Sequence, residues 1–460
     1  MAGVNVGVDD YALSRVPQSA RYSWWSVAIQ RFGQLSALSG FLLGSTLGFG
    51  MTFWDAFWAL TLGAVVLEIV AIFVGIIGVR EGLQTSVIAR WTGFGHAGSS
   101  LLGVAIGVSL IGWFGIQTGV SAAGLSELMG VLPTWGWSLV FGLAVTFIVL
   151  WGFRSMQWVA YLTVPAFLVL VGWSIISELT NHSLGDLVRS APAGPQLTLL
   201  QGTTLVAGSF IVGAVITPDM TRFNRTTGDV VKQTVVGITL GEYGVGLSGV
   251  LLAHAIRSDN IITIITSSVG WVGTLVIILG TLKINDWNLY SSGLGIVNFV
   301  GTIFGKHVNR AVVTLVIGVI GSVLAAGGIL DRFIDFLTIL GVAFPPIAGI
   351  MVAEYFIVKR WGPELDESRA RNALPATAPT WVPATIVIWV VAALIGRFWD
   401  WGLPSINSLV ISMVLYVVAG KTGLVRGVGV SRTLDAETEG DGTEDTRPKS
   451  VARLSKPNAD

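Results

Sequence analysis

Apolar segments long enough to cross a lipid bilayer recur along almost the whole chain. About twelve such runs are visible, each close to the roughly 17–25 residues that a transmembrane helix needs. They lie near 27–50, 54–78, 97–122, 137–152, 157–178, 198–220, 231–256, 270–296, 311–327, 333–357, 381–397 and 405–424. Because backbone polar groups inside lipid are satisfied only in helices or closed barrels, the pattern predicts an all-α membrane protein with about twelve transmembrane helices.

The composition excludes several other classes of protein. Charged residues make up 12% of the 460 residues, whereas a soluble domain carries about 25%. The formal net charge is zero, which gives no electrostatic basis for binding a nucleic acid. The chain has no cysteine, and its four histidines are scattered without ligand spacing. We therefore expect no metal site and no cofactor. The expected partners are the lipid bilayer and a small molecule, and the expected assembly is a monomer or a weak oligomer.

Lysine and arginine fall unevenly on alternate connections between the apolar runs. With residues 1–26 as a cytoplasmic N-terminal segment, most basic residues, Arg31 among them, fall on the cytoplasmic side. The opposite side holds only Arg189, Arg257, Arg332 and Arg397. Because positive residues concentrate on the cytoplasmic side of membrane proteins, we predict a multi-pass protein of the cell (inner) membrane with both termini cytoplasmic.

Two stretches outside the apolar runs are polar. Residues 360–380 contain proline and predict a linker. Residues 426–460 are rich in Asp, Glu, Thr, Arg and Lys and have few large apolar groups, so they predict a disordered cytoplasmic tail.

Two of the apolar runs contain small and polar residues where an uninterrupted helix would be apolar. These residues lie near 36–40 in the first run and 208–214 in the sixth. If 27–178 and 198–357 are two five-helix repeats, followed by two extra helices in 381–424, the two runs occupy equivalent positions. Interrupted helices at equivalent positions of two halves indicate a transporter binding site. We therefore expect unwound segments that face each other, while close packing by small residues is the alternative.

Charged residues also stand inside the eighth run. Lys283-Ile284-Asn285-Asp286 lies between two apolar stretches. Charges at membrane depth are costly and normally mark an ion or substrate path. Asp286, Glu242 and Glu68 are candidate partners for Lys283, and a purely structural ion pair is the alternative.

Five motifs in consistent order resemble those of a known family. They are Val16-Pro17-Gln18-Ser19-Ala20-Arg21, Gly112-Trp113-Phe114-Gly115, Gly208-Ser209-Phe210-Ile211, Asn285-Asp286 with Leu289-Tyr290-Ser291-Ser292-Gly293-Leu294-Gly295, and Phe344-Pro345-Pro346 with Gly349, Glu354 and Tyr355. Together they resemble the bacterial cytosine permeases of the nucleobase–cation symporter family. The resemblance implies the LeuT-like five-plus-five inverted-repeat fold with two extra helices. It also implies import of cytosine, a purine, a hydantoin, allantoin or a related ring, driven by sodium or protons.

The resemblance also assigns substrate-binding residues. Trp113 and Phe210 correspond to the family's two stacking aromatic residues, and Gln117 and Asn288 to amides that read the edge of the ring. Ser209 would add a hydroxyl or, through an unwound backbone, a free N–H. A nucleobase is flat with a polar edge, so aromatic faces and amides suit it. Ordinary helix packing is the alternative for each residue.

The chain departs from the cytosine permeases at three positions. They carry glutamine where this chain has Leu110, asparagine where it has Trp287, and alanine where it has Asn288. The set of edge-reading groups has therefore moved. A purine, a modified pyrimidine or a hydantoin-like ring remains open beside cytosine.

The coupling site departs as well. Lys283 and Ile284 stand where sodium-coupled relatives offer hydroxyl groups. An ammonium can occupy a cation site lined by carbonyls. Our hypothesis is that Lys283 replaces sodium and that coupling uses protons. The residues that we expect to take part in ion coupling are Lys283, Asp286, Glu242, Ser36 and Ser39.

Two other functions are compatible with the sequence. They are a sodium-coupled symporter of the hydantoin or allantoin type and a non-transporting substrate sensor on the same scaffold. No nucleophile–base or zinc-protease motif is present, so we predict that the chain is not an enzyme. The glycine-rich stretch 93–100 lacks the lysine of a phosphate-binding loop.

Overall fold

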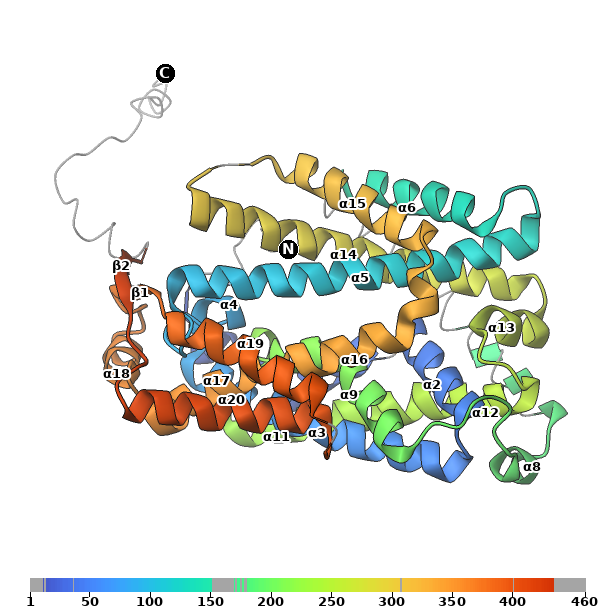
Figure 1. The fold of residues 1–460 in the computed structure, drawn as a ribbon, viewed down its shortest axis with the longest axis horizontal. Helices are drawn as coiled ribbons and strands as arrows, with labels where there is room; N and C mark the ends of the chain where they lie inside the picture. The colour runs from blue at the N-terminus through green and yellow to red at the C-terminus, as the bar shows by residue number, and fades with distance from the viewer. Residues whose placement is uncertain are drawn as a thin grey trace, which may run out of the picture.

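The chain forms a bundle of long helices that run side by side, with short elements at both ends (Figure 1). The computed structural model describes residues 11, 14–35, 37–150, 169, 172–173, 176–177, 180–306, 308–399 and 401–433. Its elements are η1 (Gln18–Ala20), α1 (Trp24–Leu35), α2 (Leu38–Gly50), α3 (Phe53–Glu81), α4 (Thr85–Ile88), α5 (Gly95–Met129), α6 (Thr134–Leu150), α8 (Leu184–Arg189), α9 (Leu199–Val215), α10 (Pro218–Thr221), α11 (Thr227–Gly241), η2 (Glu242–Leu247), α12 (Ser248–Ile256), α13 (Ile261–Val269), α14 (Val272–Phe304), α15 (Arg310–Ala326), η3 (Ile329–Arg332), α16 (Phe333–Ala343), α17 (Pro345–Val352), η4 (Ala353–Val358), α18 (Gly362–Ala370), β1 (Thr377–Trp381), α19 (Pro383–Phe398), α20 (Pro404–Lys421) and β2 (Val428–Arg432).

Apolar helices of membrane-spanning length dominate the described residues. Five helical stretches are long and apolar enough to cross a membrane, and five shorter apolar helices of 10–17 residues accompany them. Every apolar run expected from the sequence overlaps a helix of the structure, except the fifth, 157–178, which lies mostly outside the described residues. The helical, multi-pass character of the chain follows from this.

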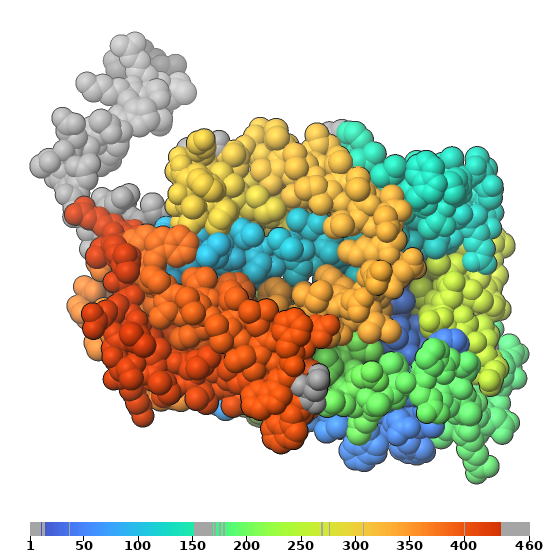
Figure 2. Space-filling view, in the orientation of Figure 1, coloured from blue at the N-terminus to red at the C-terminus, as the bar shows by residue number. Residues whose placement is uncertain are grey.

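The helices form two packed groups with the last helices against one of them. In the first group α5, α6, α14 and α15 pack on one another, and in the second α1 and α2 pack on α11 and α12 while α3 packs on α9 and α11. Helix α16 packs on α9, and α17 and α19 pack on α20. In Figure 2 the red and orange C-terminal helices fill the lower left of the viewed face, and α5 shows as a blue band between them and the yellow α14 and α15 above.

Local sequence signals set several helix boundaries. Thr198 and Gln201 form a capping box at the start of α9, and Thr226 and Asp229 form another at the start of α11. These side chains satisfy N–H groups that the first helical turn leaves unpaired. Gly82 ends α3 with a φ of 63°, a conformation that glycine adopts without strain.

The first run is interrupted close to the expected place, but the sixth is not. Helix α1 ends at Leu35 and α2 begins at Leu38. Helix α9 continues through Val215, so the expected unwinding over 208–214 is wrong, and the interruption lies at 216–217, before Pro218. Gly208 serves packing instead, because a side chain there would clash with the backbone carbonyl of Leu337 in α16.

Two further runs are interrupted. The seventh passes through η2, a π-helical stretch, and the tenth breaks at Phe344, where Pro345 begins α17. A π-helical stretch inside an α-helix is often found at a functional site.

The start of the tail is structured, contrary to the expected disorder, and the polar linker contains a helix and a strand. Residues 362–370 form α18, and β1 pairs antiparallel with β2, Thr377 opposite Arg432 and Trp381 opposite Val428. The strand in the tail is stable because β1 supplies its hydrogen-bonding partner, which a local composition argument does not see. Residues 434–460 lie outside the described part of the chain.

A buried carboxylate fixes this end of the structure. Glu81 at the end of α3 accepts hydrogen bonds from Arg15 at 2.7 Å, from Arg369 at 2.8 Å and from the Tyr355 hydroxyl at 2.5 Å. Because a buried carboxylate is stable only when its charge is compensated, these three groups hold α3, η4, α18 and the N-terminal segment together.

Candidate functional site

A small cavity lies at the interruption of the first run. Its volume is about 30 Å³, and it is lined by Gln34, Leu35, Ser39, Gly40, Leu43, Ser209, Phe210, Gly241, Glu242 and Gly246. The interruption thus brings four of the residues selected from the sequence together: Ser39, Ser209, Phe210 and Glu242. Ser36, also selected, lies outside the described residues.

Glu242 is the most unusual group in this cavity. Its side chain stands at the start of η2 and is 4% exposed. Its Oε1 atom has no hydrogen-bond partner within the described part of the chain. A buried carboxyl group is costly unless it binds a proton or is paired with a cation, so Glu242 is available to bind either.

Helix α9 supplies a ring and a hydroxyl to the cavity. Ser209 Oγ donates to the carbonyl oxygen of Val206 at 2.7 Å, within the same helix. Because α9 is continuous here, unwinding does not free the N–H of Ser209, and that expectation is wrong. Phe210 is partly buried and lines the cavity.

Trp113 and Gln117 stand one turn apart on α5. The Trp113 ring makes edge-to-face contacts with Phe333 at 6.2 Å and with Phe336 at 5.3 Å between ring centroids. Among the described rings, none of its contacts is with Phe210. The Oε1 atom of Gln117, a residue that is 4% exposed, has no hydrogen-bond partner among the described residues. An unpaired buried amide oxygen is a free acceptor for a ligand N–H.

Asn288 belongs to a chain of amides that joins α14 to α5. Its Nδ2 donates to Asn285 Oδ1 at 3.3 Å. Asn285 Nδ2 in turn donates to the Phe114 carbonyl at 3.2 Å and lies 3.0 Å from Thr118 Oγ1. Asn285 was not predicted from the sequence as a link between helices. Its position one turn before Asn288 places the two amides on the same helix face and could have indicated the link.

Lys283 pairs within its own helix. Its Nζ lies 3.2 Å from Asp286 Oδ1, with the lysine side chain 32% exposed and the aspartate 1% exposed. Glu68 accepts instead from Thr239 at 2.7 Å. Within the described residues, no hydrogen bond joins Lys283 to Glu242, to Glu68 or to the α1–α2 connection. The structure thus brings Lys283 together with Asp286 and leaves Glu242 in the other helix group.

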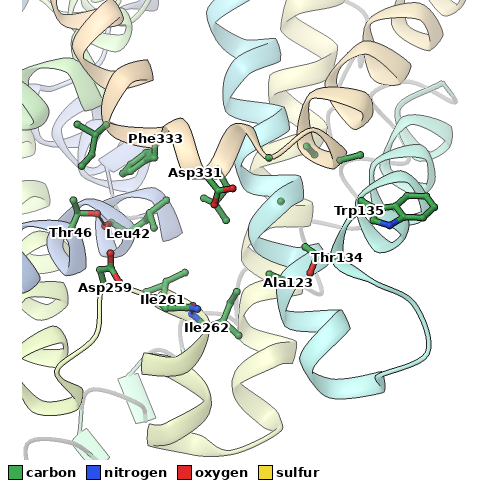
Figure 3. Close-up of a pocket in the computed structure, with 17 residues that line it drawn as sticks. Leu42, Thr46, Ala123, Thr134, Trp135, Asp259, Ile261, Ile262, Asp331 and Phe333 are labelled. Carbon is green, nitrogen blue, oxygen red and sulfur yellow. Dashed lines mark hydrogen bonds between the residues drawn. The ribbon is translucent and has the colours of Figure 1, made fainter. Parts of the chain in front are cut away.

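A larger cavity opens between the two helix groups (Figure 3). Its volume is about 720 Å³, and its walls come from α2, α5, the start of α6, the start of α13 with the segment before it, the end of α15, η3 and the start of α16. Phe333 lines this cavity and also contacts Trp113. Figure 3 shows Phe333 near Leu42 and Thr46 of α2, with Asp259 and Asp331 also on the wall. Phe333 therefore connects the wall of this cavity with the Trp113 ring, which does not itself line the cavity.

Arg31 was not selected as a site residue from the sequence and was counted only among the basic residues of the cytoplasmic side. Its side chain is 1% exposed, so it is buried within the protein. Its Nη1 donates to the Gly213 carbonyl at 3.2 Å and its Nη2 to Thr217 Oγ1 at 2.9 Å, and its Cζ lies 5.7 Å from the centre of the Phe210 ring. The available signal was its position inside the first apolar run.

Comparisons with known proteins agree with this fold and these motifs. Residues 15–415 match the family model described as "Permease for cytosine/purines, uracil, thiamine, allantoin". The cytosine permease of Escherichia coli (strain K12) is 28% identical over 413 residues, which cover 89% of this chain and 94% of the relative. The hydantoin permease of Microbacterium maritypicum is 22% identical over 460 residues, covering 94% of this chain and 90% of the relative.

The fold is that of Mhp1, a transporter whose solved structures are similar to this chain over nearly its whole length. The inward-facing conformation of Mhp1 superimposes with a TM-score of 0.76 at 17% identity, covering 94% of this chain and 97% of that one. Mhp1 in a closed conformation with bromovinylhydantoin bound gives a TM-score of 0.68 at 18% identity, covering 94% of this chain and 98% of that one. This similarity establishes the LeuT-like fold of the chain.

Proposed function

Because this chain belongs to the family of permeases for cytosine, purines, uracil, thiamine and allantoin, and is therefore a membrane transporter rather than an enzyme, we propose that it imports a nucleobase or related small heterocycle together with protons. The observation that carries the proposal is the cavity at the first interruption, which joins the ring of Phe210 to the unpaired carboxyl of Glu242. A stacking surface and an ion-binding group at one helix break are what a coupled transporter needs.

The proposed architecture has about twelve spans. Two inverted five-helix repeats would occupy 27–178 and 198–357, with two extra helices in 381–424. Interruptions in the first and sixth runs, at equivalent positions of the two repeats, support this arrangement. The distribution of lysine and arginine supports cytoplasmic termini and an inner-membrane location.

The proposed substrate is a flat ring held by α5, α9 and α14. It would stack on Trp113 and Phe210, with Gln117, Ser209 and Asn288 at its edge. Since Trp113 packs on Phe333 and Phe336 in this structure, α16 would have to yield when the ring binds. Curated relatives are named for cytosine and for hydantoin. The departures at Leu110 and Trp287 favour a purine, a modified pyrimidine or a hydantoin-like ring over cytosine itself.

The proposed coupling ion is the proton. Glu242 would carry it at the helix break, and the Lys283–Asp286 pair would change its proton content or its hydrogen bonds between the alternating states. Ile284 has no side-chain oxygen to offer a sodium ion, and Lys283 beside it would repel one, which supports protons as the coupling ion. Sodium remains the second candidate, because the Glu242 carboxyl and the Ser39 hydroxyl line one cavity and are oxygen ligands.

A ligand panel on purified protein tests the substrate class. Cytosine, purines, hydantoins and allantoin are each added in sodium chloride and in choline chloride, and the melting temperature is recorded. A ligand that binds the folded state raises the melting temperature. We expect one class of ring to do so equally in both salts. Stabilisation by none of the rings would contradict the proposed substrate, and stabilisation only in sodium chloride would favour the sodium alternative.

A further inference from the structure

Arg31 joins the two interrupted runs through a single side chain. It stands on the last turns of α1, and its acceptors Gly213 and Thr217 stand on either side of Val215, where α9 ends. Gly237 of α11 makes room for the side chain, because a Cβ atom there would lie 2.6 Å from Arg31 Cγ. The guanidinium thus reaches from one helix break to the other within the protein interior.

The position has a clear electrostatic reason. The carbonyl groups of a last helical turn lack partners and carry partial negative charge. In transporters with broken helices, such helix ends and unwound carbonyls hold the coupling cation. At the end of α9 the Arg31 guanidinium takes the place of such a cation: the Gly213 carbonyl accepts from Arg31 Nη1 and also, at 3.2 Å, from the Thr217 hydroxyl. Asp219 attracts the Arg31 guanidinium electrostatically. Its carboxylate, however, accepts a hydrogen bond from the backbone N–H of Thr85 at 2.7 Å, and within the described residues it forms no salt bridge with Arg31.

Arg31 also touches two residues that line the small cavity. Its Cζ lies 5.7 Å from the centre of the Phe210 ring, within the range of a cation–π interaction. Its Nη1 lies 3.5 Å from Gln34 Oε1, the limit of a hydrogen bond. The guanidinium lies behind the cavity wall. From there it contacts the aromatic face of Phe210 and the amide of Gln34, and it thereby orients both.

We propose that Arg31 is a positioning residue for the transported ring: a built-in cation that closes the end of α9 and holds Phe210 and Gln34 against the substrate. Arg31 does not line the cavity and acts on the ligand through these two side chains. The inference rests on the proposed function for its binding consequence. Its structural consequence, a fixed end of α9, stands without any ligand.

Substrate binding tests the positioning role in the full-length protein. Arg31→Met keeps most of the apolar stem and removes the charge, and we expect it to weaken binding of the best ring from the panel about tenfold, as for loss of charged hydrogen bonds. Arg31→Lys should recover part of the loss. In a double-mutant cycle, Arg31→Met and Phe210→Leu should be far from additive, because both remove the same oriented ring. Unchanged affinity in Arg31→Met, or additive losses, would overturn the proposal.

Arg222 provides a matched control. It is also a buried arginine over an aromatic ring, with Cζ 4.7 Å from the centre of Phe223, and it donates to the Tyr11 carbonyl at 2.7 Å. Neither Arg222 nor Phe223 lines the small cavity. Arg222→Met should lower the melting temperature without weakening ligand binding. An equal loss of affinity in both variants would mean a general structural effect and would overturn the positioning role.

A second readout needs no ligand and separates this inference from the proposed function. Because the chain has no cysteine, Ile216→Cys gives a single thiol at the end of α9, between the two acceptors of Arg31. Labelling by a small thiol reagent should be several-fold faster with Arg31→Met, since local opening becomes easier, and unchanged with Arg222→Met. Equal labelling rates in all backgrounds would overturn the inference, even if transport is established. Failure of every ring to bind would instead overturn the proposed function and leave the labelling result to decide the role of Arg31.

Discussion

Phe333 lies edge-to-face against Trp113, with ring centroids 6.2 Å apart, and the same phenylalanine lines the cavity of about 720 Å³ between the helix groups. The residue therefore stands between an open space and the aromatic face assigned to the substrate. If the substrate binds at Trp113 as proposed, a ring that travels there from the cavity would have to pass Phe333. We therefore propose Phe333 as a gate on that path.

Removing the gate should speed exchange of substrate. Phe333→Ala is expected to accelerate dissociation of a bound ring by up to about tenfold, because an aromatic pair contributes on the order of 1 kcal/mol beyond its buried area. Stopped-flow release of a fluorescent or competed ligand measures the rate. Ile334→Ala is the control, since Ile334 lines the same cavity without a ring. Equal dissociation rates in the two variants would remove Phe333 from the path.

Trp113 and Gln117 should determine affinity. Loss of a stacking face should cost on the order of 1–3 kcal/mol of binding, as for base–aromatic stacking elsewhere, so Trp113→Ala should raise the Kd by roughly tenfold to a hundredfold. Gln117→Ala should also weaken binding, because the ligand would lose the free amide oxygen of Gln117 as a hydrogen-bond acceptor. Trp58→Ala, at an exposed tryptophan of α3, is the control. Unchanged affinity in both site variants would show that the substrate binds elsewhere.

Glu242 should be needed for accumulation but not for exchange. Glu242→Gln keeps the shape of the side chain and removes its ability to carry a proton. We expect uptake driven by a pH gradient to be lost, while exchange of labelled for unlabelled substrate across the membrane continues. The control is Glu68→Gln, because Glu68 is already hydrogen-bonded to Thr239. Accumulation that survives in Glu242→Gln would assign coupling to another group.

The Lys283–Asp286 pair can be tested by removing one partner and then both. Lys283→Met leaves the buried Asp286 without its cation and should lower the melting temperature more than Lys283→Met with Asp286→Asn, because an unpaired buried charge costs more than a missing pair. If the pair serves coupling, the double variant regains stability but not proton-driven uptake. Full recovery of both would mean that the pair is only structural.

The sequence predicted the helices of the described residues well, because hydropathy is a local property. The sixth interruption was misplaced because glycines such as Gly208 and Gly213 can mark either a break in a helix or a close contact between helices. Only the structure shows that Gly208 lets α16 pack closely against α9. Pro218, which cannot donate to the preceding turn, was the better signal for the end of α9. The tail was misjudged for a similar reason, since Val428–Arg432 forms a strand only beside a partner some fifty residues earlier in the chain.

The candidate site was predictable only in part. Motif resemblance selected Phe210 and Ser209, and the search for a charged partner of Lys283 selected Glu242. The fold places all three around one cavity. Phe333 looked like any apolar residue of its run, because contact with Trp113 depends on how α16 crosses α5. Arg31 lies near the start of a span, and charge counting cannot tell a side chain that reaches solvent from one that turns inward.

Uptake into proteoliposomes under separately imposed gradients tests the central claim most directly. The labelled ring selected from the panel is offered outside vesicles that carry either a pH gradient, acidic outside, without sodium, or an inward sodium gradient at equal pH. We predict accumulation with the pH gradient alone and none with sodium alone. Strict dependence on sodium would contradict proton coupling, and no accumulation of any ring under either gradient would contradict the proposed transport of heterocycles.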